Sequence, residues 1–282
     1  MIEFLVENLL LLPFLFVTYL VLEAMEAKAG GAFERSLGRV RSIGPVFGAL
    51  AGAFPQCGVA ASASSLYSGG VITAGTLIAV FLSTSDELVP VLLNCPSVGA
   101  AVPFKIVGIK VAAAIVAGLS VNLALRIFKG ARAERTGHHI GEICSHSHCG
   151  CGRRKGIVVP ALIHTLEVFV FILAVSSVFK IVEVFYGTGW IEALALSSPL
   201  IGELVGGVAG LIPNCAISVV CAQMYAEGLM SPGALMASSF TGCGVGFVVL
   251  FRQNRDRKAN LSLLAAVYLI GCLLGFLTGW ML

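Results

Sequence analysis

Residues 48–58 read "GALAGAFPQCG", and residues 206–216, which lie 158 positions later, read "GGVAGLIPNCA". Both stretches are apolar up to a proline, and an amide residue and a cysteine follow that proline. Between residues 48 and 92, the same ungapped shift gives 12 identities in 45 positions. Biased composition produces some matches by chance, but not a matched Pro-amide-Cys triplet among them, so the pattern predicts an internal repeat.

The composition around these triplets is typical of a membrane protein. Of the 282 residues, 57% are hydrophobic and 12% are charged, whereas a soluble domain carries about 25% charged residues. A helix needs about 20 apolar residues to cross a bilayer. We therefore expect an all-α polytopic membrane protein of about ten membrane segments, with lipid and not nucleic acid around it. The apolar runs span residues 4–22, 43–66, 71–93, 98–125, 157–179, 199–225, 229–250 and 261–282.

The basic residues predict the orientation of the chain. Fourteen of the 18 Lys and Arg residues fall within 28–41, 129–155 and 252–258, and the positive-inside rule places such segments in the cytoplasm. Both termini then lie outside, in the cytoplasmic membrane of a prokaryote. With these ends fixed, residues 43–93 must cross an odd number of times, although they are too short for three full crossings.

By the same argument, residues 187–251 must also cross the membrane an odd number of times, but in the opposite direction. Each core then holds either one crossing with a re-entrant hairpin or three short crossings. The sequence thus predicts two repeats of inverted topology, each with a broken or re-entrant helix core. The predicted parts are a first repeat over 1–128, a cytoplasmic loop over 129–156 and a second repeat over 157–282.

Broken backbone is tolerated in a membrane only where protein buries it or where it lines a cavity. Paired breaks in inverted repeats are typical of secondary transporters, which hold substrate between the halves; a structural proline kink is the alternative. A second break is predicted in each half, at "LSTSDELVP" (82–90) and "FTGCGVGF" (240–247). The candidate substrate-binding residues at the four breaks are Gln56, Cys57, Ser83, Thr84, Ser85, Asp86, Glu87, Asn214, Cys215, Thr241 and Cys243.

These side chains indicate what the breaks would bind. Thiols with carboxylates favour a borderline-soft cation such as zinc, ferrous iron or cadmium, whereas carboxylates with hydroxyl and amide oxygens suit manganese. An acid in the membrane is by default a functional hypothesis, although Asp86 also reads as a helix N-cap. The two cysteines also fit small packing positions. In the fourth long run, Lys110 is a candidate counter-charge for Asp86 or Glu87.

Two further groups of ligating side chains lie outside the breaks. His164 and Glu167 are three residues apart and share a helix face, which fits either proton coupling or a local interfacial pair. The loop "HHIGEICSHSHCGCG" (138–152) alternates His and Cys, which in a reducing compartment indicates metal binding, for capture or sensing; an accidental His/Cys-rich linker is the alternative. Its candidate metal ligands are His138, His139, Cys144, His146, His148, Cys149 and Cys151.

The paired "PQC" and "PNC" breaks, the ten-segment count and the His/Cys loop resemble a ten-helix heavy-metal exporter family, whose members are named as arsenic efflux permeases or manganese transporters. The chain is more distantly similar to organoarsenical permeases. The resemblance covers nearly the whole chain and implies efflux of a metal or metalloid. It carries over Cys57 and Cys215, in their Pro-x-Cys contexts, and the loop ligands as a group.

We therefore expect a secondary transporter that exports a heavy-metal or transition-metal ion, and not an enzyme. The chain has neither a GxxxxGK[ST] loop nor a DKTGT motif, so it does not hydrolyse ATP as P-loop or phosphorylated pumps do. No cofactor is required; the expected ligands are the transported ion and a metal that the loop residues could bind. The alternatives are an arsenite or organoarsenical permease, a membrane thiol oxidoreductase and a metal sensor. The sequence leaves open which ion is carried, in which direction and with which coupling ion. It also leaves open the oligomeric state, for which a homo-oligomer is one option.

Overall fold

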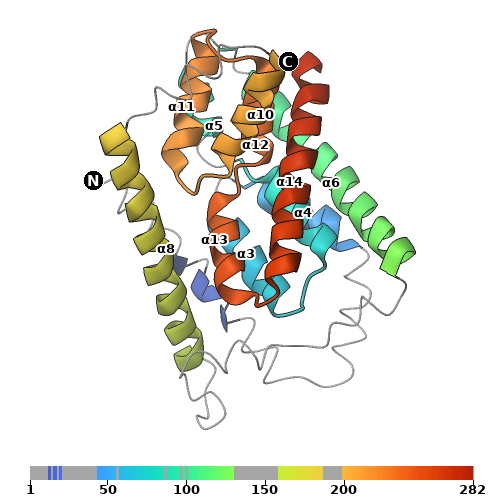
Figure 1. Cartoon of the computed structure of the whole chain (residues 1–282), viewed down its shortest axis with the longest axis vertical. Helices are drawn as coiled ribbons and strands as arrows, with labels where there is room; N and C mark the ends of the chain where they lie inside the picture. Colours follow the sequence, from blue (N-terminus) through green and yellow to red (C-terminus); the bar gives the residue numbers. More distant parts are fainter. Residues whose placement is uncertain are drawn as a thin grey trace.

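A computed structural model describes residues 12–13, 15–17, 19–20, 43–54, 57–85, 88–95, 98–99, 101–129, 158–186 and 199–281 (Figure 1). All regular secondary structure in these residues is helical, as the sequence predicts. A helix spans Ile43–Gly52. The labelled helices are α3 (Cys57–Ser68), α4 (Ala74–Ser83), α5 (Leu88–Leu93), α6 (Ala101–Lys129), α8 (Val158–Tyr186), α10 (Pro199–Gly210), α11 (Cys215–Ala226), α12 (Pro232–Phe240), α13 (Gly244–Gln253) and α14 (Arg257–Thr278), which the 3-10 turn Gly279–Met281 follows.

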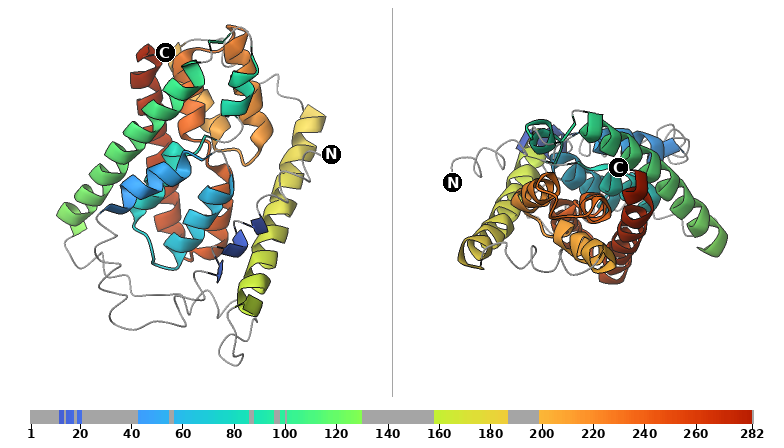
Figure 2. Two further views of the ribbon diagram at one scale, coloured as in Figure 1. Left: turned by 180° about the vertical axis from the view of Figure 1, so that it is seen from behind. Right: turned by 90° about the horizontal axis from the view of Figure 1, so that it is seen from above.

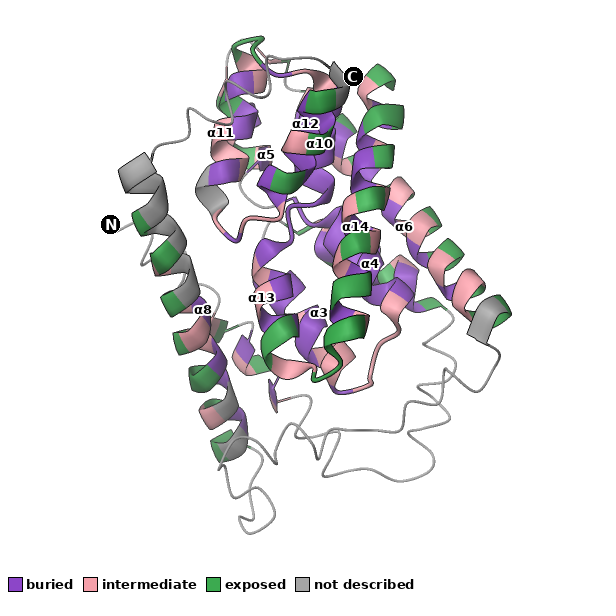
Figure 3. Cartoon of the chain, viewed as in Figure 1, coloured by how far each residue is buried: buried purple, intermediate pink, exposed green. Residues whose placement is uncertain are grey.

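Four stretches of the described chain are long and apolar enough to cross a membrane: Ala74–Leu93, Ala101–Ile127, Pro232–Gln253 and Arg257–Met281. Over an 18-residue window, the buried share is 75% in the first stretch and 83% in the third, but only 28% in the second and 33% in the fourth. Figure 3 shows this difference in its colours: α4, α12 and α13 are mostly purple, whereas α6 and α14 carry many green, exposed residues. The apolar helices indicate a membrane-embedded protein, because exposed faces of this composition suit lipid. The predicted count of about ten segments stays a prediction.

Both buried central segments are interrupted. The first consists of α4, which ends at Ser83, and α5, which begins at Leu88; the second consists of α12, which ends at Phe240, and α13, which begins at Gly244. These interruptions coincide with the breaks predicted at 82–90 and 240–247. Helix α4 packs on α6, and α12 packs on α14.

The two interrupted segments run past each other in opposite directions. Helix α13 contacts α3 of the first half, and α5 contacts α11 of the second half. In Figures 1 and 2, α3, α4 and α13 lie toward one end of the molecule, while α5, α11 and α12 lie toward the other. The two central segments therefore start at opposite ends of the molecule, and the second helix of each, α5 or α13, contacts a helix of the other half.

Helices α3 and α11 end with the same local geometry, 158 residues apart. Gly70 has φ 72° and Gly228 has φ 75°, a left-handed conformation that glycine adopts without a Cβ penalty. The N–H of Gly70 donates to the Tyr67 carbonyl over 2.9 Å, and that of Gly228 donates to the Tyr225 carbonyl over 3.0 Å. The matched Tyr and Gly residues of the sequence thus form matched helix ends.

The helices that follow also begin alike. Thr73 caps α4 by accepting a hydrogen bond from the N–H of Thr76, and Ser231 caps α12 by accepting one from the N–H of Ala234. A hydroxyl at this position satisfies one of the amides that a helix start leaves without a partner. The two caps are again 158 residues apart, although Thr and Ser are not identical.

Rows of glycine let each preceding helix approach the central segment. Gly44, Gly48 and Gly52 recur at every fourth residue, and the second half repeats the row at Gly202, Gly206 and Gly210. A Cβ added at Gly52 would lie 2.6 Å from the Val80 carbonyl oxygen, and one at Gly206 would lie 2.6 Å from the Ala234 carbonyl oxygen. Small residues at this spacing permit close contact between membrane helices. The backbones of the helix Ile43–Gly52 and of α10 therefore touch α4 and α12 directly.

This contact predicts that Gly206→Ala destabilises the protein by roughly 1–3 kcal/mol, because the methyl group overpacks a site next to rigid backbone. Thermal unfolding of the detergent-purified protein measures the effect. Gly108→Ala is the matched control, since it lies in a helix and a Cβ there meets nothing within 4 Å; it should be neutral or stabilising. Equal melting temperatures for the two variants would contradict the prediction.

Candidate functional site

A buried lysine joins the two interrupted segments. Lys110 lies on α6 and is 0% exposed. Its Nζ donates to the carbonyl oxygen of Ser239 over 2.8 Å, to the Oγ of Ser239 over 2.7 Å and to the carbonyl oxygen of Thr84. The ring of Phe240 lies 6.0 Å from the same ammonium. One cation therefore contacts the end of α4 and the end of α12.

The position of these carbonyls follows from helix geometry. Thr84 is the C-cap of α4, and Ser239 lies in the last turn of α12. The last four carbonyls of a helix have no partner further along the helix, and the C-terminus carries about half an elementary negative charge. A buried ammonium is tolerated only where it is hydrogen-bonded or paired. The two helix ends supply that environment to Lys110.

In the second half, the Pro-Asn-Cys break lies beside the second break. A Cβ added at Gly244, the first residue of α13, would lie 2.6 Å from the Leu211 carbonyl oxygen and 2.7 Å from the Pro213 nitrogen. Thr241 Oγ1 lies 2.8 Å from the carbonyl oxygen of Gly207, near the end of α10. The structure thus brings together two segments that the sequence separates by about thirty residues.

In the first half, three hydroxyls line the break and fold back on their own chain. Ser83 is 0% exposed, and Thr84 and Ser85 are each 1% exposed. Ser83 and Thr84 donate to the Val80 carbonyl over 3.0 and 2.8 Å, and Ser85 donates to the Ser83 carbonyl over 3.2 Å. Because each hydroxyl proton is used locally, these side chains shape the break and offer a substrate only oxygen lone pairs.

The start of α13 is packed tightly against the first half. The rings of Phe81 and Phe247 meet edge to face with centroids 4.8 Å apart. Ser64 on α3 donates to the Gly246 carbonyl over 2.7 Å, and a Cβ at Gly246 would lie 2.7 Å from the Phe81 ring. Contacts of this kind place the second break next to the end of α4.

The described residues hold part of the predicted substrate set. Asn214 is half-buried and directly precedes α11, while Cys243 is buried with its Sγ 3.4 Å from the Thr241 carbonyl. Cys57 and Cys215 are the first residues of α3 and α11, and their side chains lie outside the described part. Also outside it are Gln56, Asp86, Glu87 and the loop ligands His138, His139, Cys144, His146, His148, Cys149 and Cys151.

Within the described residues, no group of three or more His, Cys, Asp and Glu side chains is placed to hold a metal ion. The residues that converge there are hydroxyls, carbonyls, one thiol and the Lys110 ammonium. A metal site at the breaks therefore depends on side chains beyond the described part, and the metal-ligand assignments stay predictions.

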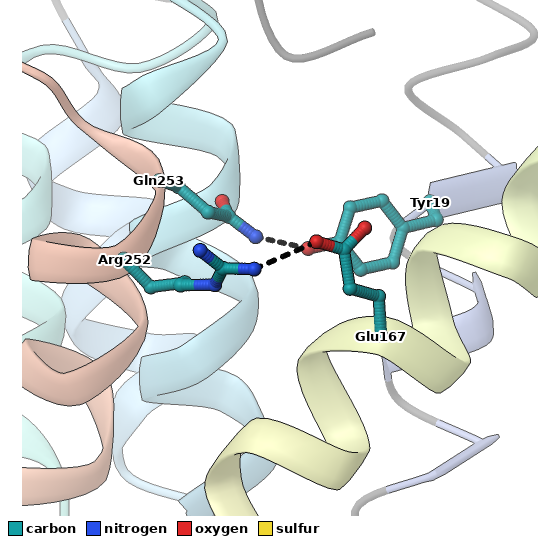
Figure 4. A network of polar contacts seen from close by, with 4 residues as sticks. All are labelled: Tyr19, Glu167, Arg252 and Gln253. Carbon is teal, nitrogen blue, oxygen red and sulfur yellow. Dashed lines mark hydrogen bonds and ion pairs between the residues drawn. The ribbon is translucent and has the colours of Figure 1, made fainter. Parts of the chain in front are cut away.

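Glu167 takes part in a contact between α8 and α13 (Figure 4). Its Oε1 accepts a hydrogen bond from Arg252 Nη2 over 2.8 Å, and the two side chains are 39% and 47% exposed. Beside this pair, Gln253 Nε2 donates to the hydroxyl of Tyr19, which lies 3.2 Å from Ser65 Oγ. The side chain of His164 lies outside the described part, so the His-Glu relay stays a prediction.

Three buried polar residues were not recognised as site residues from the sequence. Nothing in the sequence marks Ser239 as a site residue, because serines are common in apolar runs. Glu203 is an acid in an apolar run, and that signal was available; its carboxylate faces Gly233 in the first turn of α12. Asn122 accepts a hydrogen bond from the Gly75 N–H over 3.0 Å, in the first turn of α4. Both oxygens lie at helix N-termini, where negative charge is stabilising.

No protein-family model, no curated protein and no solved structure matches this chain. The resemblance to heavy-metal exporters therefore stays an expectation, and the function is argued from the arrangement of the breaks.

The Lys110–Ser239 contact predicts a large coupling energy. In a double-mutant cycle of Lys110→Met and Ser239→Ala, we expect an interaction free energy of about 1–3 kcal/mol, because a buried hydrogen bond to a charged group is lost. Chemical unfolding of the four proteins measures it. The matched control is a cycle of Lys105→Met and Ser239→Ala, because Lys105 is an exposed lysine on the same helix. This control cycle should show no interaction free energy. A value near zero for Lys110 as well would contradict the contact.

The Glu167–Arg252 pair predicts a small effect on stability. Because both side chains are more than one-third exposed, Glu167→Gln should lower the free energy of unfolding by less than about 1 kcal/mol, and less at high salt. Unfolding at low and high ionic strength measures this. Arg252→Gln is the companion variant and should behave alike. A cost of several kcal/mol would contradict the surface-pair interpretation.

Proposed function

We propose that this protein is a secondary transporter that moves a thiol-binding heavy-metal or transition-metal ion across the cytoplasmic membrane, with the substrate held at the paired helix breaks. The observation that supports this proposal is that the breaks of both halves meet at Lys110, through Thr84 and Ser239. Interrupted helices are tolerated inside a membrane protein only where protein buries them or where they line a cavity, and transporters hold their substrates at such interruptions.

The proposed architecture is a pair of inverted-topology repeats. It is supported by the opposite course of the two central segments, by the contacts of α13 with α3 and of α5 with α11, and by the matched glycines Gly70 and Gly228. Alternating access follows from such symmetry, because the two halves exchange roles when the site opens to the other side.

The proposed direction is export. The His/Cys loop is predicted on the cytoplasmic side, where it would deliver ions to the breaks, and Cys57 and Cys215 begin the helices that follow the breaks. Borderline and soft ions favour thiolate and imidazole ligands. The loop and the paired thiols would then handle the same cargo in succession.

One observation favours a second candidate, a metalloid permease. The ammonium of Lys110 lies at the breaks, and a dication about 6 Å from it would be repelled by roughly 5 kcal/mol at an effective dielectric constant of 20. A neutral metalloid hydroxide that bonds to thiols is not repelled in this way. A divalent metal would need the carboxylates of Asp86 and Glu87 to offset the lysine.

Flux into liposomes tests the proposal. We expect the purified protein to carry one of manganese, zinc, cadmium and arsenite, and the Cys57→Ser/Cys215→Ser variant to lose at least tenfold of that flux, because both thiols would bind the cargo. Cys272→Ser is the matched control, since Cys272 lies on α14 against the Glu203 carbonyl. Wild-type protein that carries none of these substrates would reject the proposal.

Asp86→Asn then separates the two candidates in the same assay. Loss of flux favours a metal cation, which needs the carboxylate, whereas retained flux favours a metalloid. Equal flux in the wild type and the double cysteine variant would show that the triplets are structural.

A further inference from the structure

The oxygens around Lys110 form the kind of site that transporters use for a coupling cation. In secondary transporters, unwound backbone carbonyls and the C-terminal ends of half-helices coordinate sodium ions or protons. Here the ammonium contacts the carbonyls of Thr84 and Ser239 and the hydroxyl of Ser239. Two of these oxygens belong to the ends of the interrupted helices α4 and α12.

The chemistry of these three oxygens suits a monovalent cation. All three are uncharged, and divalent ions such as Ca²⁺ and Mg²⁺ are generally bound through carboxylates. The partial negative charge of a helix C-terminus is about half an elementary charge, and two such ends converge on one point. Together the two ends contribute about one negative elementary charge to this point, which favours a monovalent cation such as an ammonium or a sodium ion.

Lys110 also lies between the two interrupted helices, where a coupling ion would contact both halves. Its hydrogen bonds reach across 26 residues to Thr84 and across 129 residues to Ser239. A cation at this point therefore contacts both halves, and its removal would break contacts to both interrupted helices.

We propose that the ammonium of Lys110 is a built-in substitute for a coupling sodium ion. The native protein then binds no sodium at this position and transports without a sodium gradient. Removing the side chain leaves the oxygens without their cation and creates a sodium site. The statement on transport rests on the proposed function, whereas the statement on the sodium site does not.

Thermal unfolding of the full-length protein in detergent tests the site. The probe is sodium chloride, compared with N-methylglucamine chloride at the same ionic strength. We expect sodium to raise the melting temperature of Lys110→Ala by about 3 °C or more, in a saturable way, because an ion that binds only the folded state stabilises it. The wild type should not respond, and neither should Lys105→Ala, the exposed lysine on the same helix.

Two results would overturn the proposal: a Lys110→Ala protein that is indifferent to sodium, or a wild type that responds as strongly as the variant. Lys110→Ser is the second variant, since it supplies an additional oxygen and fills less of the space than lysine. If neither variant yields folded protein, the wild-type liposome assay decides. Flux that changes less than twofold when the sodium gradient is removed supports the proposal, and a tenfold fall contradicts it.

The outcome is separable from that of the proposed function. If no substrate is transported but Lys110→Ala gains sodium-dependent stability, the transporter proposal fails and the cation site stands. If cargo is transported but sodium does not change the melting temperatures of Lys110→Ala and Lys110→Ser, the transporter proposal stands. The proposal that Lys110 replaces a sodium ion then fails.

Discussion

The constraint on which this structure depends is the burial of one ammonium group. Lys110 is fully buried on α6, and an ionised group in an apolar interior is costly unless oxygens surround it. Continuous helices cannot provide those oxygens, because their carbonyls are used internally. The ends of α4 and α12 provide them, so the two breaks and the lysine require each other. The interruption of the central segments is therefore part of the same interaction that solvates the charge.

Close packing brings the helix ends to that point. The glycine rows that include Gly52 and Gly206 allow backbone contact with α4 and α12, and apolar lipid offers no strong drive for helices to associate otherwise. The edge-to-face contact of Phe81 with Phe247 then aligns the start of α13 with the end of α4. Outside this core, α6 and α14 expose apolar faces, and the contact of Glu167 with Arg252 attaches α8 at one edge. The interior is thus closely packed, while α8 adds an exposed ion pair at one edge.

The arrangement of the breaks also bears on which cargo the proposed transporter would carry. The predicted substrate residues that the structure describes contribute mainly hydroxyls whose protons are used locally, such as Thr84, together with the buried thiol of Cys243. The positive charge of the Lys110 ammonium beside these groups disfavours a multiply charged cation unless carboxylates accompany it. In the proposed transporter, electrostatics at the breaks, more than the number of soft ligands, would therefore discriminate between a metal ion and a metalloid. It is also the reason for the proposal that Lys110 takes the place of a coupling ion.

The sequence by itself determined the helical class, the apolar segments, the positions of the second breaks and the match of Gly70 with Gly228. These features are local: apolar length, a proline, a capping hydroxyl or a glycine with positive φ acts within a few residues. Only the tertiary structure decided that Lys110 reaches Thr84 and Ser239, and that Glu167 pairs with Arg252, 85 residues away. The sequence offered Asp86 and Glu87 as counter-charges for Lys110, and this stays a prediction because both acids lie outside the described residues. A charge pattern shows which partners exist but not which helix ends converge. Helix packing decides that convergence, and it depends on contacts between residues that no local pattern relates.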